Sequence, residues 1–239
     1  MIDRIAVLMP AYNERTQIAQ TLASLRREAA GQFDVTVFLV DDGSDPAIDL
    51  QALPRPTAEF RIVALRHAVN LGQGAALETA RQMSLCERNI SAFVTMDADG
   101  QHRAADALAV ARVICAGADI AFGNRFLGHS NVPLARTALL RAALLFEWAL
   151  TGLRLTDAHN GLRAFSRAAL ERIPIRQSRM AHATEIKQRA SRASTLVIVE
   201  VPVSLRYTRE SIAKGQRSLG ALAIVHDLFD HYLFGGPET

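Results

Sequence analysis

The sequence predicts an α/β fold in which a mostly parallel, Rossmann-like sheet is flanked by helices. Short runs rich in Val, Ile and Phe alternate with helical patterns over the first 125 residues, and polar or turn-forming residues follow each of those runs. Strands that alternate with helices are joined by right-handed crossovers into a parallel sheet. Such sheets bind their ligands beyond the carboxyl ends of the strands, so we expect a site there.

Five strands and three helices are expected before residue 125. Each strand is a short apolar run bounded by residues that turn the chain, and the strands are residues 2–9, 35–40, 61–65, 92–96 and 120–123. Each helix has apolar residues at spacings of three and four, and the helices are residues 14–29, 73–86 and 104–116.

From residue 134 onward the pattern changes. We expect an amphipathic helix over 134–155, a helix over 181–193, a strand within 196–207 and a last amphipathic helix over 219–234. Charged residues interrupt the helix over 134–155, so no window reaches the roughly 18 apolar residues that cross a bilayer. This helix packs on the protein's own core or lies on a membrane surface. No long linker separates residues 1–125 from residues 126–239, which predicts one merged domain with a helical, basic C-terminal extension.

The composition is that of a globular protein, with 49% hydrophobic and 21% charged residues. Cys86 and Cys115 form no CxxC pair and no secretory leader is evident, so a reducing cytosol is expected. Residues 1–119 carry a net charge of −4 and residues 120–239 carry +7, almost all of it from arginine. The positive half reflects either a genome rich in arginine codons or an anionic partner.

Polar segments follow all five expected strands. They are PAYNE (10–14), DDGSD (41–45), RHAVNLGQG (66–74), DADGQH (97–102) and GNRF (123–126). Because the carboxyl ends of parallel strands meet at one edge of a sheet, five such segments indicate a single site along that edge.

The segment after the fourth strand has the composition of a metal site. Asp97 and Asp99 are two residues apart, and a turn allowed by Gly100 would bring both carboxylates onto one ion. Such hard oxygen ligands suit Mg²⁺ or Mn²⁺, and Gln101 could add an oxygen or orient a water. The alternative is a solvated turn that caps the helix beginning near residue 104.

Other segments offer groups for a nucleotide. Asp41 and Asp42 could accept hydrogen bonds from a nucleobase or a ribose, or could simply turn the chain and cap a helix over 44–50. Tyr12 offers a flat face for a base, and Glu14 could reach ribose hydroxyls or balance a helix dipole. The glycine-rich NLGQG (70–74) could present backbone N–H groups to an anion.

Taken together, five motifs resemble those of the GT-A nucleotide-sugar glycosyltransferases of family 2. The motifs are MPAYNE, VDDGSD, NLGQGAALETA, MDADGQH and GNRF. The dolichol-phosphate mannose synthase and polyprenyl-phosphate glycosyltransferase branch is the most similar, and HNGLRAFSR and the EVPVSLRYT…KGQ tail extend the match over most of the chain. Departures are Gln73, where many relatives have lysine, and Ala80, where glycine is frequent.

The resemblance implies a metal-dependent, inverting hexosyltransferase that uses Mg²⁺ or Mn²⁺ and a UDP- or GDP-linked sugar donor. It places the donor against Pro10, Ala11, Tyr12, Glu14, Asp41, Asp42, Asp97, Arg125 and Lys214. It places the cation among Asp97, Asp99 and Gln101. It places the acceptor near Asn160, Gly161, Arg163, Arg206, Tyr207 and Gln216.

The acceptor decides whether a catalytic base is needed. A phosphate acceptor is already anionic, whereas a hydroxyl must lose its proton to a nearby base. Asp157 is the first candidate for that base, followed by Glu185 or His182. In the structural alternatives, Asp157 caps a turn and Glu185 pairs with Arg189 one helical turn on.

The basic half and the helix over 134–155 favour an anionic acceptor, either a polyprenyl phosphate or a cell-envelope glycan. The protein would then work in the cytoplasm, in peripheral contact with the inner face of the membrane, and no nucleic-acid partner is expected. The alternative function is a catalytically idle nucleotide-sugar-binding protein at the membrane surface. A phosphohydrolase would need a nucleophilic aspartate near the first strand, where PAYNE stands, and a pyrophosphorylase would need a GxGxR-type loop there.

Overall fold

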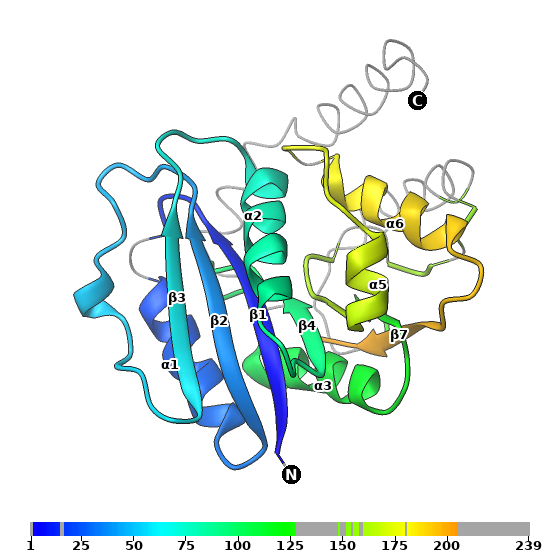
Figure 1. Cartoon of the computed structure of the whole chain (residues 1–239), viewed down its shortest axis with the longest axis horizontal. Coiled ribbons are helices and arrows are strands. Elements are labelled where there is room, and N and C mark those ends of the chain that lie inside the picture. The colour runs from blue at the N-terminus through cyan, green and yellow to red at the C-terminus, as the bar shows by residue number, and fades with distance from the viewer. Residues whose placement is uncertain are drawn as a thin grey trace. The chain divides into compact units, whose positions relative to one another are not determined.

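The structure, a computed structural model, describes residues 2–14, 17–127, 148, 152–153, 155–157, 160–179 and 181–204. Within these residues seven strands form one sheet in the order β3-β2-β1-β4-β6-β5-β7 (Figure 1). The strands are β1 (Asp3–Ala11), β2 (Phe33–Asp41), β3 (Phe60–Arg66), β4 (Ala92–Thr95), β5 (Ile120–Asn124), β6 (Arg163–Phe165) and β7 (Ile198–Pro202).

The sheet is mostly parallel, as expected. Strand β1 pairs in parallel with β2 and β4, β2 with β3, and β5 with β7. Strand β6 is antiparallel to both of its neighbours, β4 and β5. The sequence did not predict β6, because its three residues lie inside the polar motif HNGLRAFSR and are too few to show a period.

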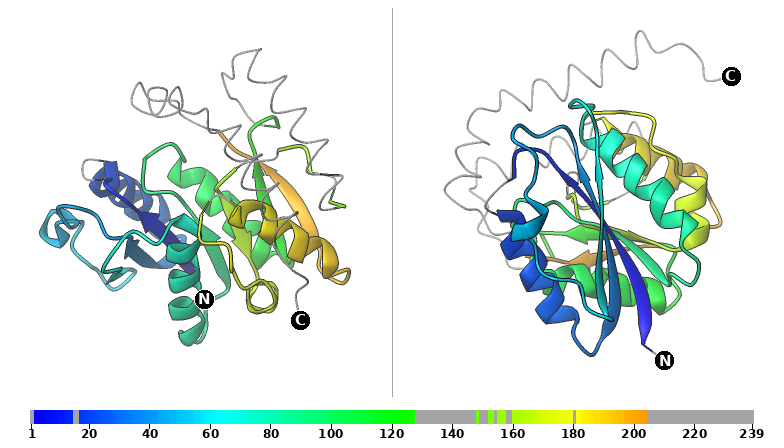
Figure 2. Two further views of the ribbon diagram at one scale, coloured as in Figure 1. Left: turned by 90° about the horizontal axis from the view of Figure 1, so that it is seen from above. Right: turned by 60° about the vertical axis from the view of Figure 1, so that its left-hand side comes forward.

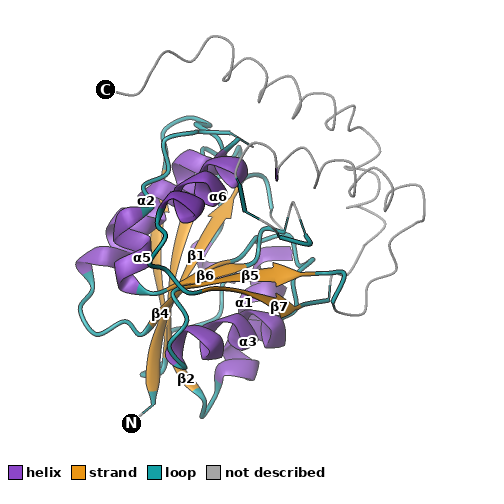
Figure 3. Cartoon of the chain, turned by 90° about the vertical axis from the view of Figure 1, so that its right-hand side faces the viewer, coloured by secondary structure: helices purple, strands orange, loops and turns teal. Residues whose placement is uncertain are grey.

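Helices cover both faces of this sheet, as Figures 2 and 3 show. On one face, α1 (Gln17–Ala29) and α3 (Ala104–Cys115) share a core with alternate residues of the strands, Val7 and Val37 among them. On the other, α2 (Gln73–Cys86), α5 (Arg167–Arg172) and α6 (His182–Arg192) pack against residues such as Leu8 and Phe38. Strands buried on both faces read as continuous apolar runs, which is why the sequence revealed them.

The five strands and three helices expected before residue 125 are confirmed to within a few residues. The helix expected from residue 14 begins at Gln17. A helix over 44–50 is not present; a 3₁₀ turn, η1 (Leu50–Ala52), follows instead, and Asp49 caps it. The expected helix over 219–234 and nearly all of the one over 134–155 lie outside the described residues. No helix among the described residues is long and apolar enough to cross a membrane.

Asp42 fixes the segment that joins β3 to α2. Its carboxylate is 2% exposed and accepts four hydrogen bonds. His67 Nδ1 and the amide of Leu71 bond Oδ1 at 2.7 and 3.0 Å, and Asn70 Nδ2 and the amide of Gly72 bond Oδ2 at 3.0 and 2.8 Å. Every lone-pair direction of this carboxylate is therefore used within the protein.

The beginning of α2 is closed by another part of the chain. The amides of Gly74 and Ala75 both donate to the carbonyl of Ser178, at 2.7 and 3.3 Å. A Cβ at Gly72 would lie 2.4 Å from that same oxygen, so glycine is what lets the two segments meet. Three of the five NLGQG amides, those of Leu71, Gly72 and Gly74, therefore already donate to protein acceptors and are not free for an anion in this structure.

Candidate active site

Asp97 lies just beyond the end of β4, where three other segments meet it. Gln73, the first residue of α2, donates from Nε2 to Asp97 Oδ1 at 2.8 Å. His102 Nε2 lies 3.4 Å from Asp97 Oδ2. Gly161 lies directly against the carboxylate, because a Cβ there would be 2.5 Å from Oδ2. Thr95 holds Gly161 in place by donating from Oγ1 to its carbonyl at 2.7 Å.

The surroundings of Asp97 keep it ionised. Burial alone would raise the pKa of its carboxyl, but the hydrogen bond and charge of His102, with the charges of Arg163 and His182, together lower that pKa. Asp97 is therefore a fixed negative charge in a partly buried, polar environment.

Asp99 has the opposite electrostatic character. Burial, the negative charge of Asp97 and that of Glu14 raise the pKa of the Asp99 carboxyl. Gln101 binds this carboxylate twice, through its backbone amide to Oδ1 at 3.0 Å and through Nε2 to Oδ2 at 2.5 Å. Gly100 makes the turn between them with φ of 74°. The expected tight turn is present, and Gln101 acts in it as a donor that orients Asp99.

This arrangement fits a divalent cation. Asp97 and Asp99 repel each other, and a bound cation would remove the repulsion that raises the pKa of Asp99. The described residues contain no group of three or more His, Cys, Asp or Glu side chains placed to hold a metal ion by themselves. That donor set suits Mg²⁺ or Mn²⁺, since Mg²⁺ is usually held by one or two carboxylates, with waters and substrate phosphates completing its shell.

The expected nucleoside residues lie around the ends of β1 and β2. Pro10 and Ala11 close β1, and Tyr12, which follows, is 48% exposed and free to offer a ring face. Glu14 lies close enough to Asp99 to raise its pKa. Asp41, like Asp42, is engaged within the protein, accepting from the amides of Ser44 and Ile48 at 2.9 and 3.1 Å. Nucleoside binding by the two aspartates stays a prediction, because both carboxylates here hold turns.

Arg125 and Asp157 form a buried ion pair. Both the backbone amide and Nε of Arg125 donate to Asp157 Oδ2, at 2.9 and 2.7 Å, and the two side chains are 6% and 0% exposed. Removing either partner would take away an ion pair that helps to offset the cost of burying the other charge. The pair joins the GNRF segment to the TDAHNG segment, so a phosphate contact for Arg125 and a base role for Asp157 both stay predictions.

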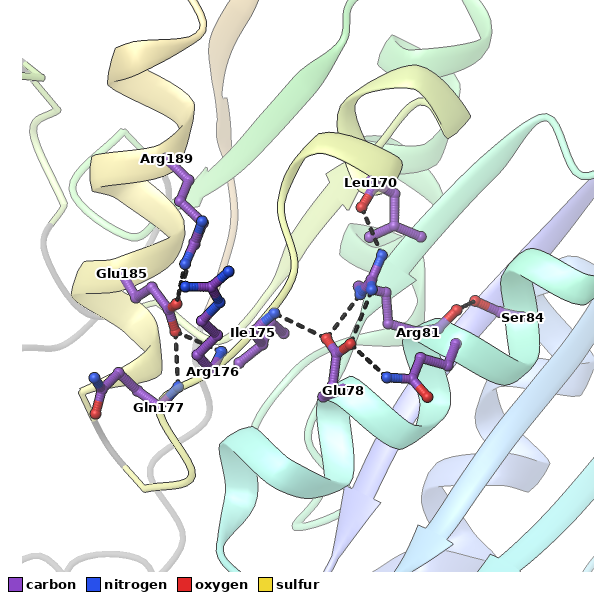
Figure 4. A network of polar contacts seen from close by, with 10 residues as sticks. Glu78, Arg81, Ser84, Leu170, Ile175, Arg176, Gln177, Glu185 and Arg189 are labelled. Carbon is purple, nitrogen blue, oxygen red and sulfur yellow. Dashed lines mark hydrogen bonds and ion pairs between the residues drawn. The ribbon is translucent and has the colours of Figure 1, made fainter. Parts of the chain in front are cut away.

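Glu185 is held in a polar network that Figure 4 shows. Its Oε1 pairs with Arg189 one turn along α6, at 2.9 and 3.0 Å, as the structural alternative anticipated. Its Oε2 accepts from the amides of Arg176 and Gln177, both at 2.9 Å. Glu78 of α2 holds the same connector from the other side by accepting from the amide of Ile175 at 2.8 Å. Through these contacts Glu185 holds in place the segment that closes the beginning of α2.

His182, the first residue of α6, is the candidate base with the most suitable chemistry. Its Nδ1 lies 2.7 Å from the carbonyl of Arg179, which can only accept, so Nδ1 carries the hydrogen. Burial, followed by the positive charge of Arg163, lowers the pKa of His182 to about 4. The ring is therefore neutral near pH 7, and its Nε2 keeps a lone pair.

Of the residues predicted to bind the acceptor, the structure describes three. Asn160 and Arg163 are buried and Gly161 is partly buried; Gly161 lies against Asp97, and Arg163 pairs with β4. Asn160 Oδ1 accepts from the amide of Leu162 at 3.0 Å, while its Nδ2 has no hydrogen-bond partner among the residues that the structure describes. A buried amide donor without a partner costs free energy and suits a site that a ligand completes. The remaining residues, Arg206, Tyr207, Lys214 and Gln216, lie outside the described residues.

Two residues that hold Asp97 were not expected in the site. Gln73 appeared in the sequence only as a departure from lysine, although its position at a helix start beside a glycine-rich turn was a usable signal. His102 follows the DADGQ segment directly, and an imidazole so close to two carboxylates was a second signal. The Gln73 contact joins the first residue of α2 to the end of β4, which sequence spacing does not reveal, whereas the His102 contact lies within one short segment after β4.

The family is settled by comparison with known proteins. The model of the family described as Glycosyl transferase family 2 matches residues 6–174, well over half of the chain. The chain belongs to glycosyltransferase family 2. The predicted resemblance and the GT-A fold are thus confirmed, and the protein is a family 2 glycosyltransferase.

Curated relatives of this glycosyltransferase act on lipid-linked substrates by name. UDP-N-acetylglucosamine–dolichyl-phosphate N-acetylglucosaminyltransferase of Methanococcus voltae is 28% identical over 95% of this chain and 96% of its own. Polyprenol monophosphomannose synthase of Mycolicibacterium smegmatis is 30% identical over 72% of this chain and 65% of its own.

Among solved structures, glucosyl-3-phosphoglycerate synthase of Mycobacterium tuberculosis, in complex with Mn²⁺, UDP and phosphoglyceric acid, superposes with a TM-score of 0.65. The match covers 99% of this glycosyltransferase and 80% of that chain, at 19% identity. At this identity the likeness establishes the fold.

Replacing Gly161 by alanine should disturb Asp97 directly. The new methyl group would lie 2.5 Å from Asp97 Oδ2, so the carboxylate must move away from Gln73 and His102. We expect Gly161→Ala to weaken Mn²⁺ binding in the presence of nucleoside diphosphate by about tenfold, as loss of groups that orient a metal ligand does. Titration calorimetry measures this, and an unchanged affinity would show that the position of Asp97 does not matter for the ion.

The depressed pKa of His182 should appear in the pH dependence of stability. The unfolded chain takes up a proton at this residue near pH 6.5, whereas the folded protein resists it until about pH 4. The free energy of unfolding should therefore fall as pH decreases from 6.5 to 4, by about 3 kcal/mol from this residue. Urea unfolding of wild type and His182→Gln measures it: the decrease should be smaller in the variant, and parallel pH curves would contradict the assignment.

Proposed function

We propose that this glycosyltransferase moves a sugar from a UDP- or GDP-linked donor to a polyprenyl phosphate or another anionic, lipid-linked or saccharide acceptor, with inversion at the anomeric carbon. The observation that supports it best is the pair Asp97 and Asp99 at the end of β4, with the charge of Glu14 close enough to raise the pKa of Asp99. Relatives named for dolichyl- and polyprenyl-phosphate transfer support this acceptor class.

The donor would lie along the carboxyl ends of β1 and β4. Tyr12 would stack on the base, Glu14 would bind the ribose, and Asp97 and Asp99 would hold Mg²⁺ or Mn²⁺ against the diphosphate. When bound, the cation supplies positive charge where the leaving nucleoside diphosphate accumulates negative charge. Manganese together with UDP in the structurally similar synthase supports this arrangement.

The protein's own residues would hold each group in its working state. Gln73 and His102 would keep Asp97 turned toward the diphosphate, and Gln101 would do the same for Asp99. The acceptor would approach from the side of Asn160 and Arg163, whose donor groups suit an anion. Lys214 and Arg206, in the basic C-terminal part, would add positive charge around the phosphates.

For a hydroxyl acceptor we propose His182 as the base. Its neutral ring with a free Nε2 can take a proton, whereas Asp157 is paired with Arg125 and Glu185 accepts four hydrogen bonds. For a phosphate acceptor no proton needs to be removed, and His182 would only shape the pocket. Turnover of His182→Gln should therefore fall with a hydroxyl acceptor and stay close to wild type with a phosphate acceptor.

Changing Asp99 to asparagine should lower turnover by about 10²-fold, since a main electrostatic element of the site would be lost. The measurement is steady-state transfer from UDP- and GDP-sugars to a polyprenyl phosphate in detergent, with saturating Mn²⁺. Asp34→Asn, at the opposite edge of the sheet, is the matched control and should retain the wild-type rate.

A wild-type rate for Asp99→Asn would refute the metal assignment. If wild type transfers no sugar but still binds nucleoside diphosphate, the catalytically idle binding protein is the better reading. Slow hydrolysis of the donor without acceptor, dependent on Mn²⁺, would count against that reading.

A further inference from the structure

Two large apolar side chains face solvent on the segment between β3 and α2. Val69 is 62% exposed and Leu71 is 49% exposed. We call residues 67–72 the β3–α2 rim; it lies at the top of Figure 1, at the edge of the sheet where β3 ends. Gln73, the residue after the rim, contacts Asp97, so the rim borders the candidate active site.

The backbone of the rim is held firmly. Asp42 accepts two hydrogen bonds from its amides and two from the side chains of His67 and Asn70. Gly43 brings the neighbouring turn against it, since a Cβ there would lie 2.4 Å from the carbonyl carbon of Val69. Gly43 itself has φ of 73°. Two apolar side chains are therefore displayed by a loop that cannot readily turn them inward. Neighbouring exposed apolar groups rimmed by polar residues are a feature of surfaces that another apolar body covers.

Exposed arginines border the apolar pair. Arg66 directly precedes the rim, and its side chain is 55% exposed even though Nε lies 3.7 Å from Asp41 Oδ2. Arg179 is also exposed and lies next to the rim, its Cγ 3.1 Å from where a Cβ of Gly72 would be. Apolar side chains between cationic ones match the interface of an anionic bilayer, where acyl chains meet charged headgroups.

We propose that the β3–α2 rim docks this glycosyltransferase on an anionic lipid surface, with Val69 and Leu71 inserted and Arg66 and Arg179 against the headgroups. The proposal rests on the proposed function, because a lipid-linked acceptor must reach Asp97 from a bilayer. The basic flank favours this occupant over a second copy of the chain, which would bring its own arginines against these. Docking here would place the bilayer beside the active site.

The test is co-sedimentation of the full chain with phosphatidylcholine vesicles, with and without phosphatidylglycerol, at low salt and without substrates. Wild type should bind the anionic vesicles. The double variant Val69→Asp/Leu71→Asp should lose at least about tenfold in binding, since each residue buries apolar area and the new charges oppose insertion. Val197→Asp is the matched control, because Val197 is an equally exposed valine (54%) at the start of β7, away from this edge.

Each outcome decides the proposal. The double variant and wild type should have the same thermal unfolding midpoint and the same stabilisation by nucleoside diphosphate with Mn²⁺, which excludes misfolding. If these values differ, the vesicle experiment is repeated with Val69→Ser/Leu71→Ser. Equal vesicle binding by wild type and variant, or equal loss in Val197→Asp, overturns the proposal. So does a wild-type dimer that the double variant abolishes without changing vesicle binding. Sugar transfer in detergent is measured separately, so failure of docking and failure of the proposed function are distinguishable.

Discussion

The repulsion between two carboxylates at the end of β4 is the constraint on which this site depends. The hydrogen bond and charge of His102 and the charge of Arg163 lower the pKa of Asp97, and the charge of Asp97 contributes to raising the pKa of Asp99. A fold does not place such groups together without cost. Donors to them come from α2 and from the turn after β4, and Gly161, in the segment before β6, lies against Asp97. The sheet edge is therefore built around a negative centre that a cation would neutralise.

The loops around that centre are braced by further carboxylates that face inward. Asp42 bonds the turn after β2 to the β3–α2 rim. Glu78 and Glu185 accept amides of the connector between α5 and α6 (Figure 4), and the carbonyl of Ser178 in that connector accepts the first amides of α2. Because these acids accept backbone amides, the site's geometry is held by hydrogen bonds between segments far apart in sequence. Motif residues such as Asp42 thus hold the loops of the site, while in the proposed function others would contact the ligand.

The sequence predicted the parts of this protein that depend on local pattern. Buried parallel strands and amphipathic helices leave periods that can be read directly, and the order of the motifs indicated the family. Strand β6 was not predicted because three residues carry no period. The contact of Gln73 with Asp97 was not predicted because it joins two segments far apart in sequence, and the contact of His102 was missed although both residues lie in one short segment after β4. The internal bonding of Asp41, Asp42 and Asp157 was equally hidden, since a carboxylate in a motif looks the same whether it binds a ligand or a neighbouring amide.

The central claim is that Asp97 and Asp99 together hold a divalent cation against the donor's diphosphate. Crystals grown with Mn²⁺ and UDP or GDP, measured at a wavelength where manganese scatters anomalously, test it most directly. We predict one anomalous peak within coordination distance of an oxygen from each aspartate and of the diphosphate. Bound nucleotide with no peak there, or a peak that neither carboxylate touches, would contradict the account.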